Sequence, residues 1–142
     1  MADDARPTAD LIERDEVPVL FLRVRDDVDE MSRAWERLEA VVGLRGRKLY
    51  RAFDARTLEY RVCVLAKERD DPTVFGLESG TLPGGRYLRA RLRGEPPEVY
   101  ERIGPTFEAL ERAARPGSDA TRPNIEHYRR RGEIDLLLPV AE

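Results

Sequence analysis

The stretch FLRVR at Phe21–Arg25 returns almost unchanged as YLRAR at Tyr87–Arg91. In both copies apolar and basic residues alternate, which is typical of a β-strand that buries one face. An amphipathic helical pattern and two short runs rich in β-branched and aromatic residues follow each copy. The sequence therefore predicts two related units, each with the order strand, helix, strand, strand.

The spacing of equivalent positions agrees with a duplication. Arg23 and Arg89 are 66 residues apart, whereas Phe53 and Tyr128 are 75 residues apart. Such an offset, which only grows along the chain, is what insertions in loops would leave. We therefore predict an α+β fold of duplicated strand-helix-strand-strand units, with an antiparallel sheet, helices on one face and a ligand cleft between the repeats.

The length of 142 residues predicts a single domain. We expect a polar leader over residues 1–16, a first repeat over about 17–68, a linker over about 69–80 and a second repeat over about 81–140. The linker sequence RDDPTVFGLESG is dense in Gly, Pro, Asp and Ser, which are the residues of turns.

Local signals predict where the helices begin and end. Asp27 is a candidate N-cap with Glu30 three residues later, and Gly43 is a candidate C-cap. In the second helix, Gly104 and Pro105 predict a kink or a break into two helices.

Composition excludes several classes of function. The 25 basic and 28 acidic residues are interspersed and give a net charge of -3, which argues against a direct nucleic-acid partner. The single Cys63 lies in the apolar run YRVCVLA and is expected to be a buried structural thiol. His127 is the sole histidine, so we expect no metal and no cofactor. No stretch has the character of a signal peptide or a membrane span, which predicts a soluble, cytoplasmic protein.

The ordered stretches TLPGGRYLRARLRGE, YERIGPTFEALERA, RPNIEHY and IDLLLPV resemble the GyrI-like small-molecule-binding family, which includes effector domains of BmrR-type multidrug-sensing activators. The resemblance covers about residues 17–140 and is strongest from Thr81 onward. It implies an aromatic-lined cleft in which a glutamate of the segment Pro123–Tyr128 reaches cationic or lipophilic ligands. That glutamate is Glu126 here. The chain resembles the stand-alone form of the family, because it leaves no room for a DNA-binding helix-turn-helix.

Glu126 is the central candidate. On a strand, Asn124, Glu126 and Tyr128 point to one side, and Ile125 and His127 to the other. One interpretation is a desolvated acid that attracts a cationic ligand, with aromatic rings adding about 0.5–2 kcal/mol each. The alternative is a surface carboxylate paired with an arginine, worth about 0–1 kcal/mol.

The other candidates come from the aromatic, acidic and basic positions of the predicted strands and helix. For the aromatic residues core packing is the alternative, and for Asp135 a solvated strand end. The candidate ligand-binding residues are Glu126, Tyr128, Tyr50, Phe53, Tyr60, Tyr87, Asp135, Trp35 and Arg89.

Four arginines, Arg23, Arg25, Arg89 and Arg91, occupy strand faces that are turned away from the predicted helices. If Arg89 or Arg23 neutralises Glu126, the preferred ligand is neutral, zwitterionic or carboxylate-bearing rather than cationic. Solvated arginines at a sheet edge are the alternative.

Three functions follow. The leading hypothesis is a non-catalytic protein that senses or sequesters a hydrophobic small molecule in the cleft. The second is a hydrolase of strained electrophilic natural products or xenobiotics, with Glu126 as general base. The third is a protein inhibitor of the gyrase-inhibitor type. The identity of the ligand, a protein partner and a homodimer stay open.

Overall fold

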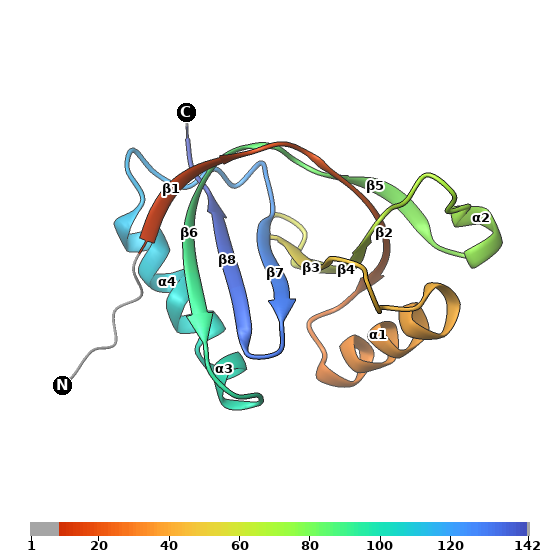
Figure 1. The fold of residues 1–142 in the computed structure, drawn as a ribbon. Helices are drawn as coiled ribbons and strands as arrows, with labels where there is room; N and C mark the ends of the chain where they lie inside the picture. Colours follow the sequence, from red (N-terminus) through yellow and green to blue (C-terminus); the bar gives the residue numbers. More distant parts are fainter. Residues whose placement is uncertain (1–8, 142) are drawn as a thin grey trace.

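The structure, a computed structural model that describes residues 9–141, is an α+β fold built on one eight-stranded sheet (Figure 1). The strands are β1 (Ala9–Arg14), β2 (Val17–Val24), β3 (Leu49–Asp54), β4 (Glu59–Leu65), β5 (Glu78–Leu82), β6 (Gly85–Arg93), β7 (Asn124–Arg130) and β8 (Glu133–Pro139). The helices are α1 (Val28–Val42), α2 (Pro72–Phe75), α3 (Glu98–Glu101) and α4 (Ile103–Ala113).

The strand order is β1-β6-β8-β7-β3-β4-β2-β5, and all neighbouring strands are antiparallel. The two predicted units lie on opposite sides of the central β7–β3 pair. On one side the order outward is β3, β4, β2, and on the other it is β7, β8, β6, so each unit places its second, third and first strand in the same sequence. The α+β class, the antiparallel sheet and the placement of the helices on one face are confirmed. The duplication itself stays an interpretation that this order accommodates.

Each predicted unit extends one strand into the other. We call these two extensions the arms: β1 with its link to β2 (residues 9–16), and β5 with its link to β6 (residues 78–84). β1 continues into β2 but pairs with β6, and β5 continues into β6 but pairs with β2. Residues 9–14, which the sequence suggested as part of a polar leader, are therefore a strand; residues 1–8 of that leader lie outside the described residues. Part of the expected linker likewise forms α2 and the start of β5. Both strands are short and polar because they lie at the two edges of the sheet.

The helix signals of the first unit act as expected. The Asp27 carboxylate accepts hydrogen bonds from the backbone N–H groups of Asp29 (2.8 Å) and Glu30 (3.0 Å), and Gly43 ends α1 with a φ of 75°. These caps satisfy backbone groups that a helix end leaves without partners. The apolar stripe of α1 packs on β2 and β4.

The second helix breaks two positions before Gly104, where its sequence suggested the break. α3 ends at Glu101 and α4 begins at Ile103, so Arg102 is the break. Gly104 and Pro105 lie in the first turn of α4, where a missing N–H costs no intrahelical hydrogen bond. Ile103 and Leu110 bury this helix against β6 and β8.

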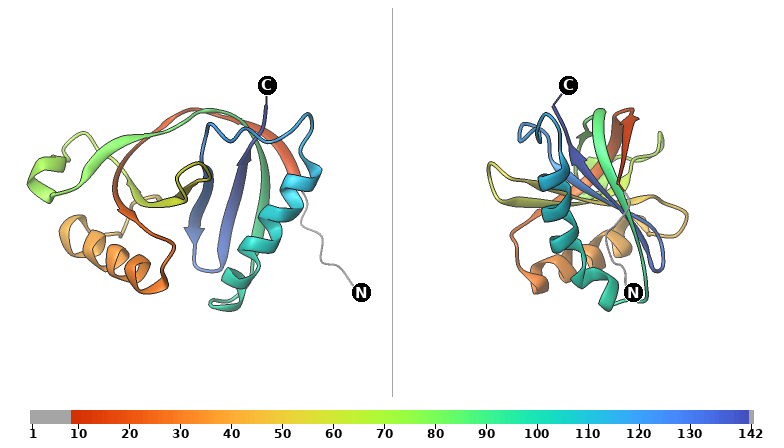
Figure 2. Two further views of the ribbon diagram at one scale, coloured as in Figure 1. Left: turned by 180° about the vertical axis from the view of Figure 1, so that it is seen from behind. Right: turned by 90° about the vertical axis from the view of Figure 1, so that its left-hand side faces the viewer.

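The helices α1, α3 and α4 lie on the same side of the sheet (Figure 2). The other face of the sheet carries a second hydrophobic core that no helix covers. The sheet curves, and the two arms arch over this core (Figure 1). Cys63 lies in this core with no exposed surface, and burial raises the pKa of its thiol to about 12. The expectation of a buried structural thiol is confirmed. No helix within residues 9–141 is long and apolar enough to cross a membrane.

The two arms pass within van der Waals distance of each other at Gly84. A Cβ atom added to this glycine would lie 2.7 Å from the carbonyl oxygen of Arg14 and 2.9 Å from the backbone nitrogen of Glu16. Both atoms belong to the backbone, at the end of β1 and just before β2, so neither can rotate away. A glycine is therefore required where the arms cross.

We expect Gly84→Ala to lower the free energy of unfolding by about 1–3 kcal/mol, because the arms must move apart. Urea denaturation measures this. Gly104→Ala is the matched control, since its Cβ would meet nothing within 4 Å and alanine favours the helix there. Equal stability of the two variants would contradict the crossing constraint.

Candidate functional site

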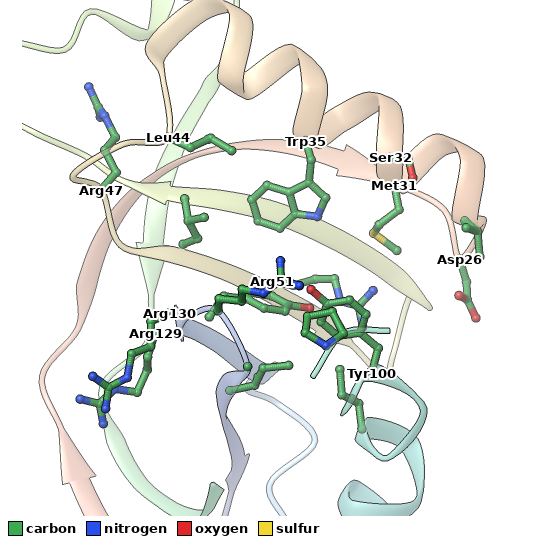
Figure 3. A pocket seen from close by; sticks show the side chains of 18 residues that line it. Asp26, Met31, Ser32, Trp35, Leu44, Arg47, Arg51, Tyr100, Arg129 and Arg130 are labelled. Atoms are coloured by element: carbon green, nitrogen blue, oxygen red, sulfur yellow. The ribbon is translucent and has the colours of Figure 1, made fainter. Parts of the chain in front are cut away.

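A pocket of about 830 Å³ lies between α1 and the α3–α4 segment, over the central strands β3 and β7 (Figure 3). We call it the helix-side pocket. It draws side chains from both predicted units, which is where the sequence placed the cleft. Its main lining residues are Met31, Trp35, Leu44, Leu49, Arg51, Tyr100, Ile103, Tyr128 and Ile134, with Asp26 and Arg129–Arg131 at its rim.

Aromatic side chains face this pocket from three elements. Trp35 projects from α1 toward the sheet (Figure 3), and its ring meets Tyr128 of β7 edge to face, with centroids 6.0 Å apart and planes at 81°. Tyr100 of α3 lies on the other side and is half-exposed. The helix-side pocket therefore offers aromatic surfaces to an apolar ligand.

An ion pair closes the floor of the pocket. Arg51 of β3 and Glu126 of β7 are direct partners across the central strand pair. Nε of Arg51 lies 3.0 Å from Oε1 of Glu126, and Nη2 lies 2.8 Å from Oε2, so the pair is bidentate. The Tyr128 hydroxyl donates a further hydrogen bond to Oε1 of Glu126. The carboxylate, 4% exposed, thus has three donors within the protein.

The ligand would meet the guanidinium and the phenol rather than the carboxylate. Arg51 and Tyr128 line the pocket, whereas Glu126 lies behind them. Nη1 of Arg51 has no acceptor among the described residues, so it can donate to a bound molecule. The guanidinium also lies over the ring of Tyr60, with its Cζ 4.8 Å from the ring centroid.

The protonation states of the floor are fixed by burial and by the ion pair. Burial and the Glu126 carboxylate raise the pKa of Tyr128 well above its ordinary value, so the hydroxyl keeps its proton. Desolvation opposes the charge of Arg51, but Glu126 more than offsets it and raises the pKa of Arg51. At physiological pH the Arg51 guanidinium is therefore charged and the Tyr128 hydroxyl is protonated.

The structure brings some of the predicted site residues to the pocket. Trp35 and Tyr128 line it, and Glu126 supports its floor. Phe53 and Tyr60 lie on the same face of the sheet as the pocket but contact each other, with ring centroids 4.7 Å apart and planes tilted by 41°, and do not line the pocket.

Four predicted residues lie on the opposite face. Tyr50 stacks on His127 at 4.5 Å, and the buried Tyr87 donates to the carbonyl of Pro83 at 2.6 Å. Asp135 pairs with Arg91, and Arg89 pairs with Asp10. None of these four side chains reaches the helix-side pocket, and a ligand-binding role for them stays a prediction.

The partner of Glu126 is Arg51 rather than Arg23 or Arg89. Arg23 pairs with Glu59 and Glu78 on the far face. Arg51 was not among the predicted site residues, although the repeat offset of 75 residues that relates Phe53 to Tyr128 also relates Arg51 to Glu126. Tyr100 was not predicted either, because an aromatic residue on a helix is its one signal in the sequence.

No protein-family model matches this chain, and no curated protein matches it in sequence. Solved structures share its fold. They include SAV2435 bound to tetraphenylphosphonium (10% identity, TM-score 0.69, 94% of each chain), an integron cassette protein from Vibrio cholerae (17%, 0.68, 94% of this chain and 95% of that one) and a hydrolase from Listeria innocua (14%, 0.63, 96% and 93%). At these identities the similarity shows the fold alone.

We expect Arg51→Met to lower the free energy of unfolding by about 3 kcal/mol, because it leaves a buried carboxylate without its cation. The double variant Arg51→Met/Glu126→Met should recover most of this loss, since both charges are then removed. Chemical denaturation of the two variants checks the difference.

Arg23→Met is the matched control, because it breaks an exposed pair worth about 0–1 kcal/mol. If the double variant is as unstable as Arg51→Met alone, the loss comes from packing and not from the unpaired carboxylate.

Proposed function

We propose that this protein binds a small aromatic or otherwise hydrophobic molecule in the helix-side pocket and does not transform it. The observation that carries the proposal is a pocket of about 830 Å³, lined by aromatic and aliphatic side chains, over a floor whose acid is already paired. Its size is typical of ligand pockets, which span about 300–1,000 Å³. The fold shared with SAV2435, a protein solved with tetraphenylphosphonium, supports the same conclusion.

The ligand that fits best is neutral or anionic and carries an oxygen acceptor. Glu126 could bind a cationic ligand only if its hydrogen bonds with Arg51 and Tyr128 were broken. The guanidinium of Arg51 would then be buried without a partner. Nη1 of Arg51 instead offers N–H donors at the floor, and the basic turn Arg129–Arg131 lies at the rim. This proposal replaces the cationic ligand that the family resemblance implies.

The geometry gives less support to hydrolysis. A general base must reach the water molecule that it activates, whereas Glu126 lies behind Arg51 and Tyr128 and does not line the pocket. Both oxygens of Glu126 accept from Arg51, and one also accepts from Tyr128, whose own proton is firmly held. The fold shared with a hydrolase from Listeria innocua therefore does not identify a catalytic residue in this chain.

We further propose that the chain forms a GyrI-like binding domain and acts in the cytoplasm, as the sequence patterns suggest. Regulation of transcription or of gyrase would require a partner, and no described surface selects one.

The charge preference can be tested with two probes of the same shape and opposite charge, tetraphenylphosphonium and tetraphenylborate, together with neutral triphenylphosphine oxide. We expect the anion and the neutral oxide to bind at least tenfold more tightly than the cation. In Arg51→Met, where Glu126 is unpaired, the order should reverse in favour of tetraphenylphosphonium. Isothermal titration calorimetry measures all six dissociation constants.

Two further variants locate the binding. Trp35→Leu should weaken all three probes about tenfold, because it removes aromatic surface from the pocket. Arg23→Met, on the other face, should leave them unchanged. Tighter binding of tetraphenylphosphonium by the native protein would show that a ligand displaces Arg51 and would overturn the charge assignment.

A further inference from the structure

The face of the sheet that carries no helix has a concave site of its own. A cavity of about 530 Å³ lies where four segments bring basic side chains together. We call it the open-face depression. Its cations are Arg14 of β1, Lys48 just before β3, Arg89 and Arg91 of β6, and Arg129 of β7.

Positive charge is in excess in this depression. Asp135 pairs with Arg91 through contacts of 2.6 and 3.1 Å and lies 3.7 Å from Arg129. Arg89 pairs with Asp10 at 3.0 Å, at the outer end of β1. These two carboxylates thus pair with three arginines, of which Arg129 also lies 3.5 Å from Glu133.

Two cations remain. Arg14 and Lys48 have no carboxylate within 4.0 Å in residues 9–141, although Glu13 also lies in the lining. Arg14 lies over the ring of Tyr50, with its Cζ 5.9 Å from the centroid. Like charges held around a cavity without counter-charges attract anions from solution.

His127 lies among the charged groups of the depression, and they change its pKa. Its ring stacks on Tyr50, and its pKa falls to about 4, first because of burial and then because of Arg14. Lys48 and Arg129 lower the pKa further, and Asp135 opposes them. The imidazole is therefore neutral at physiological pH, and one ring N–H is free to donate to an oxygen atom.

We propose that the open-face depression binds a small dianionic oxyanion, a phosphate group or a dicarboxylate, between Arg14 and Lys48 with His127 as a neutral donor. The two cations without carboxylate partners match the two charges of such an anion. The guanidinium of Arg14 can hold two of its oxygens at once. This site lies on the other face from the helix-side pocket, so it stands or falls independently of the proposed function.

His127 makes the test direct, because the chain contains one histidine and its imidazole signals in an NMR spectrum need no assignment. The probes are sulfate, inorganic phosphate and succinate, each compared with sodium chloride of equal ionic strength. A bound dianion favours the charged imidazole, so sulfate should raise the pKa of His127 from about 4 to about 5 or higher. At pH 7.5, phosphate or succinate should shift the imidazole signals in a saturable way.

The two sources of the oxyanion separate in the same titration. Tighter binding of phosphate than of succinate assigns the site to phosphate compounds, and the reverse order assigns it to dicarboxylates. A response equal to that of chloride for all three anions would overturn the proposal.

Variants show whether the response comes from this depression. Arg14→Gln and Lys48→Gln should each weaken binding about tenfold without loss of folding, because neither side chain is paired. Arg61→Gln is the matched control: it removes a cation from the same face of the sheet but outside the depression, where Arg61 lies over Phe21. An undiminished response in the double variant Arg14→Gln/Lys48→Gln would also overturn the proposal.

Discussion

The ion pair between Arg51 and Glu126 decides what the centre of this molecule can do. It bridges β3 and β7, the strand pair at which the two halves of the sheet meet. Burying two charges costs several kcal/mol per ion unless the geometry is good and the remaining lone pairs are used. A bidentate contact and the Tyr128 hydroxyl meet both conditions. The acid that the sequence singles out thus stabilises the seam, and the arginine is what faces the pocket.

Strand alternation explains how one short segment serves two faces. Glu126 and Tyr128 form the floor of the helix-side pocket, whereas His127 lines the open-face depression. The sequence predicted this division, because a period of two needs no knowledge of neighbouring strands. It also predicted both ends of α1, since the capping residues are local.

What the sequence could not supply depends on which strands become neighbours. Arg23, Arg51 and Arg89 look alike along the chain, and only the strand order puts Arg51 opposite Glu126. The same holds for the aromatic residues. Tyr50 and Tyr87 fill the core on the open face, because the sheet buries apolar residues on both sides and hydrophobicity alone cannot tell the sides apart. The strand β1 was not predicted for a related reason. A short polar segment shows no strand pattern of its own, and it becomes a strand because it pairs with β6.

The exchanged arms set the order in which the chain can mature during synthesis. β1 and β2 emerge from the ribosome first, yet their partners β6 and β5 follow only after the whole of α1, β3 and β4. Until then β2 has a bare edge, and unpaired strand edges are templates for aggregation. β8, which fills the gap between β6 and β7, comes last of all. The edge of β2 is therefore covered only by β5, and the strands of the second half join into one sheet only when β8 is present, so neither half of the sheet is complete without the other.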